Sequence, residues 1–168
     1  MKRRVVTKIG DIFSVQTGEK TKKHFQLIAC DRTQLNSDVI RAFKTTYPFD
    51  QEVDLSKIVS DEVDFYAHCI TKWGVKLGYW DKVGRSDNVG SLDHILFRGT
   101  QDYGHKDGEE PIRVSNSWYV WRINEPFRDI GKLTGINRNA EIGVVMDPIS
   151  IVNRIQKGEY GGFYPDFE

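Results

Sequence analysis

Histidines, cysteines and carboxylates are the side chains of this 168-residue chain that could carry metal or acid–base chemistry. The four histidines are His24, His68, His94 and His105. No two of them have the four-residue spacing of a helical zinc motif. Asp93 and His94 are adjacent in a segment with strand character, so their side chains point to opposite faces. Asp64 and His68 share a face of a predicted strand, but lie roughly 13 Å apart along it, which is too far to bind one ion. The sequence therefore predicts no metal site.

Nucleophile and phosphate motifs are also absent from the sequence. It contains no G-x-S-x-G, P-loop or G-x-G-x-x-G pattern. Cys69 follows His68 directly, and adjacent residues of a strand face opposite sides, so they do not form a catalytic pair. Cys30 and Cys69 match no C-x-x-C pattern and have apolar neighbours, which predicts two buried free thiols. We therefore predict no catalytic residues, no cofactor and a reducing, cytoplasmic compartment. The absence of an apolar segment near the N-terminus agrees with that compartment.

Charge is balanced overall but unevenly distributed. The chain has 24 Lys and Arg against 24 Asp and Glu, so its formal net charge is zero. This balance gives no bulk attraction to nucleic acid or to an anionic membrane, and no apolar run approaches the ~18 residues of a membrane span. The N-terminal third is basic, and an acidic segment follows it. Its carboxylates are Asp50, Glu52, Asp54, Asp61, Glu62 and Asp64. This segment is either ordinary solvated surface or an acidic edge that meets a basic partner.

Aromatic residues make up 12% of the chain, more than a small core requires. Tyrosine and tryptophan are common anchors of protein interfaces, although each could instead belong to the core. The candidates for partner binding are Tyr66, Trp73, Tyr79, Trp80, Tyr103 and Trp118. The aromatic segment Trp118–Trp121 could in principle stack on nucleotide bases. It lacks the basic groove that single-stranded nucleic acid needs, so we predict no nucleic-acid partner.

The hydrophobic pattern predicts one β-rich domain of the α+β class, spanning residues 1–168. We expect a bent antiparallel sheet or half-barrel with a C-terminal helix. The stretch Val63–Arg85 is central to this prediction. Its first half alternates with the two-residue period of a strand that is covered on both faces. Its glycines Gly74, Gly78 and Gly84 are placed where a strand would bend or turn.

Other segments complete the predicted fold. Alternation over residues 11–16 and 24–31, around a polar turn, predicts a hairpin. Residues 38–47, 92–99, 112–123 and 140–146 are predicted strands. Residues 100–111 form a polar loop, and 124–139 an irregular connection. Ser56 could cap a short helical turn. The clearest helix follows Asp147 as N-cap and Pro148 at the first position, and it ends at Gly158. We expect the aromatic C-terminal residues to fold back onto the body.

Two short motifs resemble a known family. Residues 8–13 read K-I-G-D-I-F and residues 80–84 read W-D-K-V-G. With the similar length and β-rich order, they resemble immunity protein family twenty-six of bacterial polymorphic toxin systems. That family groups with a small phosphotriesterase-like protein in some naming schemes. The resemblance implies a small cytoplasmic protein that binds and blocks a cognate toxin domain without catalytic residues. The alternative is a small metal-dependent hydrolase of phosphoesters or phosphotriesters, which would need two histidines and a carboxylate in one pocket. The loop 100–111 and the aromatic tail depart from the family pattern.

Overall fold

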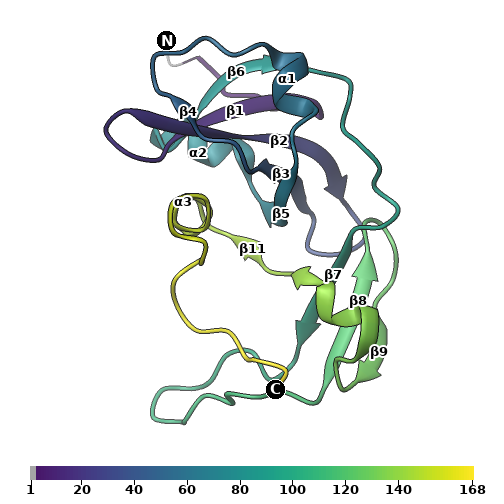
Figure 1. Cartoon of the computed structure of the whole chain (residues 1–168). Coiled ribbons are helices and arrows are strands. Elements are labelled where there is room, and N and C mark those ends of the chain that lie inside the picture. The colour runs from purple at the N-terminus through teal and green to yellow at the C-terminus, as the bar shows by residue number, and fades with distance from the viewer. Residues whose placement is uncertain (1–2) are drawn as a thin grey trace.

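The computed structural model describes residues 3–168, which build two open β-sheets with three short helices packed around the first (Figure 1). The first sheet has the strand order β11-β5-β3-β2-β1-β6, with β4 paired to β2. Its strands are β1 (Asp11–Gln16), β2 (Thr21–Asp31), β3 (Ser37–Phe43), β4 (Tyr47–Pro48), β5 (Val63–Cys69), β6 (Asp81–Arg85) and β11 (Val145–Met146). The predicted hairpin is confirmed as β1 and β2, which pair antiparallel with Phe13 opposite Phe25.

The second sheet has the order β10-β7-β8-β9. Its strands are β7 (Leu96–Thr100), β8 (Trp118–Arg122), β9 (Arg128–Gly131) and β10 (Glu141–Ile142). The α-helices are α1 (Leu55–Val59), α2 (Thr71–Leu77) and α3 (Pro148–Lys157), and η1 (Gly135–Asn139) is a 3-10 helix. Strands hold 35% of the residues and helices 16%, so the β-rich α+β prediction is confirmed. The sheets are mixed, because β11 runs parallel to β5 and β10 runs parallel to β7.

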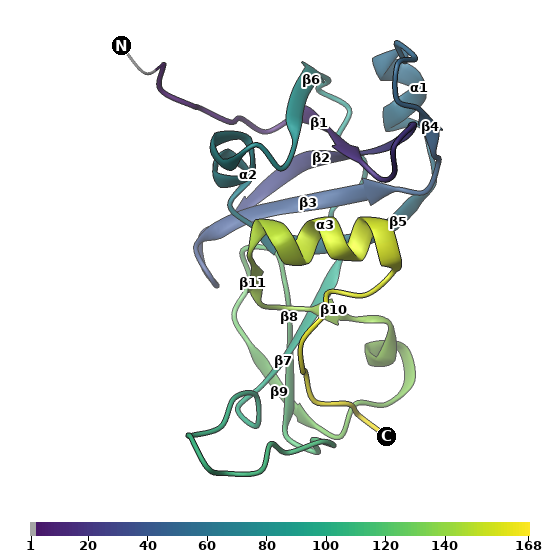
Figure 2. The same cartoon turned by 90° about the vertical axis from the view of Figure 1, so that its left-hand side faces the viewer.

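The first sheet is covered on both faces. Phe65, Ala67 and Cys69 of β5 belong to a core that α2 and α3 close, while the alternate residues Tyr66 and His68 face the second sheet. The predicted two-sided burial of this strand is therefore confirmed. Figure 2 shows α3 lying across the first sheet, and Figure 1 shows the second sheet below it.

Helix α3 forms as the sequence predicts. Asp147 accepts a hydrogen bond from the Ser150 amide at 2.7 Å, and Gly158 ends the helix in the left-handed region. Ile151 and Ile155 are fully buried against the first sheet. Each buried isoleucine contributes about 1.5–3 kcal/mol, which is what holds this short helix in place.

Helix α2 corrects the prediction for the second half of Val63–Arg85. Gly74 lies inside the helix and faces the Trp80 ring. A Cβ at this position would come within 1.9 Å of that ring, so the close packing requires glycine. Gly78 ends α2 at a φ of 80°, and only Gly84 lies in a strand, where it passes under Leu55. The glycines therefore permit close packing and helix termination rather than bends of one long strand.

Several smaller predictions are also corrected. Asp54, not Ser56, caps α1, because its carboxylate accepts from the Ser56 amide at 2.8 Å. The connection 124–139 contains β9 and η1, which lack a long apolar run. Residues 140–146 form two short strands in different sheets, separated by Gly143. A Cβ at Gly143 would lie 1.9 Å from Trp121, so the chain passes flat against that ring between the sheets.

Asp31 joins the two sheets at a fully buried site. One oxygen, Oδ2, lies 3.0 Å from both His68 Nε2 and Trp121 Nε1. The other oxygen accepts from the backbone amides of Gln34 and Asn124 at 3.2 and 3.1 Å. Burial lowers the pKa of His68, so the imidazole is neutral at physiological pH. Four donors thus satisfy one carboxylate at the point where β2, β5 and β8 meet.

The C-terminal residues fold back as predicted. The Ser115 amide donates to the Asp166 carbonyl at 2.9 Å, and Tyr164 and Phe167 pack on the core around Trp118. Within residues 3–168, no helix combines the length and apolarity that a membrane span requires.

Candidate functional site

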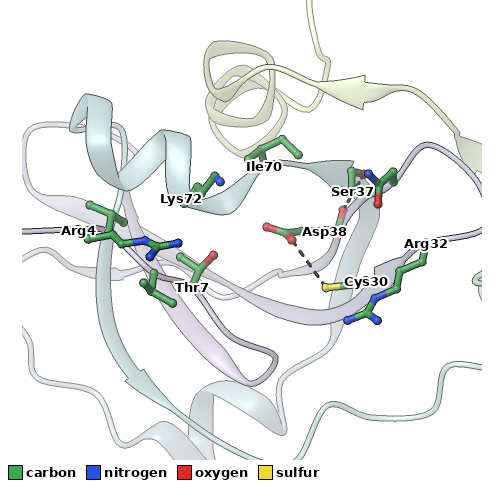
Figure 3. Close-up of a pocket in the computed structure, with 11 residues that line it drawn as sticks. Arg4, Thr7, Cys30, Arg32, Ser37, Asp38, Ile70 and Lys72 are labelled. Carbon is green, nitrogen blue, oxygen red and sulfur yellow. Dashed lines mark hydrogen bonds between the residues drawn. The ribbon is translucent and has the colours of Figure 1, made fainter.

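Helix α2 and the N-terminal arm, residues 3–7, enclose the cavity drawn in Figure 3. Its volume is about 390 Å³. The polar and charged side chains that line it include Arg4, Thr7, Arg32, Ser37, Asp38 and Lys72. They come from the arm, from the β2–β3 connection, from the start of β3 and from α2, so only the folded chain brings them together (Figure 3).

Asp38 fixes the arm to the start of α2. Its Oδ2 accepts from the Thr71 amide at 2.9 Å and from the Thr71 hydroxyl at 2.6 Å. The Thr71 hydroxyl also lies 2.7 Å from the hydroxyl of Thr7 in the arm. Trp80 donates from its indole nitrogen to the Thr71 carbonyl at 2.9 Å. These contacts hold Thr71 and Gly74 inward, and the helical period then turns Lys72, Trp73 and Lys76 outward.

A second cavity of about 630 Å³ adjoins the first. Arg4, Val5 and Lys72 line both cavities, and Trp73, Val75 and Lys76 extend the second along α2. Trp73 is 46% exposed, and the Lys76 ammonium lies 5.3 Å from the centre of its ring. We call the two cavities together the arm–α2 surface, formed by residues 3–7, Cys30, Arg32, Asn36–Asp38, Ile70, Lys72, Trp73, Val75 and Lys76.

Positive charge dominates the arm–α2 surface. Its cations are Arg3, Arg4, Arg32, Lys72 and Lys76. Between residues 3 and 168, no ion pair involves any of these five side chains. Asp38 is the single carboxylate on this surface, and its Oδ2 is engaged by Thr71. The surface can therefore bind negative groups beside an exposed apolar ring.

Cys30 in the first cavity is not an activated nucleophile. Burial and the neighbouring Asp38 carboxylate raise its pKa, so the thiol stays protonated at neutral pH. Both cysteines are free, as predicted, but only Cys69 is fully buried, whereas Cys30 is half-buried at the edge of this cavity.

The acidic segment predicted to meet a partner lies around α1 and the start of β5. Asp54 caps α1, Asp61 accepts from the Thr45 amide at 2.9 Å, and Glu62 pairs with Lys44 at 2.7 Å. Asp50, Glu52 and Asp64 are exposed. Half of this segment thus has a local structural role, and none of it lies on the arm–α2 surface.

The predicted aromatic anchors separate into exposed and buried groups. Trp73 and Tyr79 are exposed at α2, and Tyr103 is exposed in the loop after β7. Tyr66 is half-buried between the sheets. The prediction of a partner-binding role is corrected for Trp80 and Trp118, because the two side chains are 2% and 1% exposed and cannot contact a partner. Their indole nitrogens donate internally, to the carbonyls of Thr71 and Ser115.

The four histidines lie in separate environments. His24 packs on Tyr47, His68 contacts Asp31, His94 contacts Tyr66, and His105 is exposed in a loop. In the part of the chain that the structure describes, no three His, Cys, Asp or Glu side chains converge as metal ligands would. The arrangement gives the hydrolase alternative no pair of histidines with a carboxylate.

The two motifs that carry the family resemblance meet at one edge of the first sheet. β1 pairs with β6, and the Lys82 ammonium lies 2.9 Å from a carboxylate oxygen of the buried Asp11. The Lys8 amide donates to the other oxygen of Asp11 at 2.8 Å. Gly84 leaves room for Leu55 of α1. In this chain the motif residues stabilise a sheet edge.

The basic character of the arm–α2 surface was missed from the sequence. The available signal was the run Lys72-Trp73-x-x-Lys76-Leu77, in which lysine and apolar residues recur four residues apart, as on one helix face. The strand interpretation of Val63–Arg85 concealed that pattern.

Comparison with known proteins gives one weak likeness. The chain is 26% identical over 144 residues to mating-type protein ALPHA2 of Nakaseomyces delphensis, which covers 82% of this chain and 69% of that protein. No family model matches the chain. No solved structure matches it either. An identity of 26% assigns the chain to no family.

Proposed function

We propose that this chain is a protein-binding module whose arm–α2 surface recognises an acidic, partly apolar segment of a partner protein. The observation that carries the proposal is the pair of adjoining cavities that share Arg4, Val5 and Lys72. One cavity offers cations for a carboxylate, and the other offers the face of Trp73 for an apolar side chain.

Charge complementarity favours an acidic partner. Five cations surround the cavities, and none of them forms an ion pair within residues 3–168. Such a surface speeds association with a negative partner and excludes a positive one. Leu77, 59% exposed on the same helix, and Val6, 55% exposed in the arm, extend the apolar contact.

Toxin neutralisation is the form of protein binding that the family resemblance suggests. Under this proposal the cognate toxin would present an acidic segment to α2, in a reducing cytoplasm where two free thiols persist. The alternative is that the acidic edge around Asp50, Glu52 and Asp64 binds a basic toxin. The two forms make opposite predictions for charge-reversal variants.

The direct test is a titration of the protein with fluorescent peptides that combine glutamates with one leucine or phenylalanine. Binding should weaken at least tenfold in the Lys72→Glu/Lys76→Glu variant, and by a similar factor in Trp73→Ala, which are roughly the losses expected for interface anchors. The matched control, Lys106→Glu/Lys132→Glu, makes the same charge change at exposed positions elsewhere and should bind normally.

Three outcomes would contradict the proposal. The peptides could fail to bind, or the control variant could lose as much affinity as Lys72→Glu/Lys76→Glu. Basic peptides could also bind more tightly than acidic ones, which would move the interface to the acidic edge. A short oligothymidylate serves as the nucleic-acid probe, because a basic surface with one exposed indole could also bind a single strand. If it bound more tightly than the acidic peptides, the surface would be a nucleic-acid site instead.

A further inference from the structure

A third cavity lies where η1 meets the second sheet, next to Tyr66 of the first sheet and away from α2. It has a volume of about 330 Å³ and is lined by Tyr66, His94, Leu96, Arg122, Arg128 and Glu141, among others. No lining residue is shared with the arm–α2 surface. We call it the inter-sheet cleft. Its size matches the lower range of sites for small molecules.

Two arginines form one wall of the inter-sheet cleft. Arg128 of β9 pairs with Val120 of β8, so it lies on the same face of the sheet as Val120 and Arg122. The two arginines are therefore diagonal neighbours, with Cβ atoms roughly 7–8 Å apart. Neither side chain forms a hydrogen bond or ion pair with any part of residues 3–168. Two unpaired guanidinium groups in one cleft favour an anion.

Other residues that line the cleft supply further hydrogen-bonding groups. The Tyr66 hydroxyl lies 3.2 Å from His94 Nε2, and the two rings meet edge to face at 5.8 Å. Asn137 and Asn139 of η1 add amide groups. These groups can orient a ligand by hydrogen bonds without competing for its charge.

Glu141 does not cancel the positive wall. It lies on β10, and the order β10-β7-β8-β9 puts it two strands from Arg122 and three from Arg128. Three strand spacings amount to roughly 14 Å. Burial raises the pKa of Glu141, and its Oε1 accepts from the Tyr66 amide at 3.4 Å. Its carboxyl group is therefore engaged with β5, away from the two arginines.

Apolar side chains border the same cleft. Ile95, Leu96 and Ile136 line it, and Ile136 of η1 is 79% exposed. An isoleucine this exposed beside a cleft gains stability when a ligand covers it.

We infer that the inter-sheet cleft binds a small organic anion, a carboxylate or phosphate ester, with Arg122 and Arg128 on the anionic group and Ile136 on an apolar body. The cleft binds the anion without catalysing a reaction, because its side chains can form hydrogen bonds and ion pairs but include no activated nucleophile. This site is independent of the arm–α2 surface, so either proposal can fail without the other.

The test is a titration by isothermal calorimetry and two-dimensional NMR with benzoate, phenyl phosphate and neutral benzamide. We expect saturable binding of an anionic probe, shifts confined to the cleft residues, and no saturable binding of benzamide. The tighter of benzoate and phenyl phosphate identifies the anionic group. Arg122→Gln and Arg128→Gln should each weaken binding about tenfold, as expected for loss of a charge-assisted contact.

Controls separate a built site from general charge attraction. Lys106→Gln/Arg113→Gln removes two exposed cations outside the cleft and should leave binding unchanged. Ile136→Ala changes an exposed residue, so it tests the apolar contact without disturbing folding, and it should weaken phenyl phosphate binding. Absence of saturable binding, equal loss in the Lys106/Arg113 control, or retention of full affinity in Arg122→Gln/Arg128→Gln would overturn the inference.

Discussion

At the scale of single residues, the buried carboxylate of Asp31 has the largest structural role. It is fully buried, yet four donors from two strands and two loops surround it. A buried carboxylate with every lone pair satisfied is stable, but loss of its charge leaves donors without an acceptor. The two sheets therefore depend on one side chain for their polar contact.

Asp31→Asn should lower the free energy of unfolding by about 3 kcal/mol, because the new NH2 group would face an N–H donor in either orientation: the Trp121 indole, or the Gln34 and Asn124 amides. Urea denaturation followed by tryptophan fluorescence measures this loss. The matched control is Asp50→Asn on the exposed surface, which should stay within about 0.5 kcal/mol of wild type. Equal stability of the two variants would show that Asp31 does not join the sheets.

His24 makes stability depend on pH. Burial, with a further contribution from the Lys22 charge, lowers the pKa of His24 from 6.5 to about 4. Between these values the unfolded chain binds a proton that the folded chain does not. Stability is therefore complete above pH 6.5 and falls as the pH approaches 4, by about 3 kcal/mol from this residue alone.

His24→Phe keeps an aromatic ring against Tyr47 and removes the titrating group. We expect its free energy of unfolding to fall less steeply than wild type between pH 6.5 and pH 4, because the His24 contribution is gone. Denaturant curves across this range measure the difference. Parallel pH profiles for the two proteins would show that His24 is not responsible.

At the scale of elements, α2 presents the candidate surface and depends on one close contact. A helix of seven residues is too short to be stable alone, and the side chain of its N-cap residue, Ile70, forms no capping hydrogen bond. Gly74 brings its backbone against Trp80, and the Trp80 indole donates to Thr71 at the first turn. This packing fixes the direction in which Lys72, Trp73 and Lys76 project.

Gly74→Ala should destabilise the fold by about 1–3 kcal/mol despite the better helix propensity of alanine, since its Cβ would collide with the Trp80 ring. It should also weaken peptide binding by shifting α2. Thermal unfolding compared with Lys72→Ala, an exposed change in the same helix, isolates the packing effect. A Gly74→Ala protein as stable as wild type would mean that α2 does not pack on Trp80 in this way.

The sequence predicted elements that are defined by local chemistry. The hairpin of β1 and β2 and the capped helix α3 carry their turn and cap residues in place, so short-range rules were sufficient. Helix α2 was missed because Thr71 and Ile70 continue the β-branched character of β5, and because Gly74 has a packing role that no local pattern reveals. The contact of Asp31 with His68 joins residues 37 positions apart, so the sequence offered no spacing from which to infer it.

The candidate site was less predictable for the same reason. Trp73 and Tyr79, which are exposed, and Trp80 and Trp118, which are buried, were equal candidates from the sequence, because residue type alone does not distinguish them. Arg4, Arg32 and Lys72 are far apart along the chain, and only the arm lying beside α2 brings their charges together.

At the scale of the whole molecule, zero net charge conceals a separation of charge. The cations gather at the arm–α2 surface, the acidic edge surrounds α1, and the inter-sheet cleft carries two arginines of its own. The two sheets support these regions separately: the first sheet carries the arm–α2 surface at the ends of β2, β3 and β5, and the second sheet with η1 supplies most of the cleft. A balanced chain can therefore bind a charged partner selectively.

The central claim, that α2 and not the acidic edge meets the partner, is tested most directly by parallel affinity capture from lysate of the source cells. Wild type, Lys72→Glu/Lys76→Glu and Asp50→Lys/Glu52→Lys are washed at low and high salt, and the bound proteins are identified by mass spectrometry. We predict an acidic partner that wild type and the Asp50/Glu52 variant retain at low salt, that the Lys72/Lys76 variant loses, and that high salt weakens. A partner lost by the Asp50/Glu52 variant and retained by the Lys72/Lys76 variant would contradict the account.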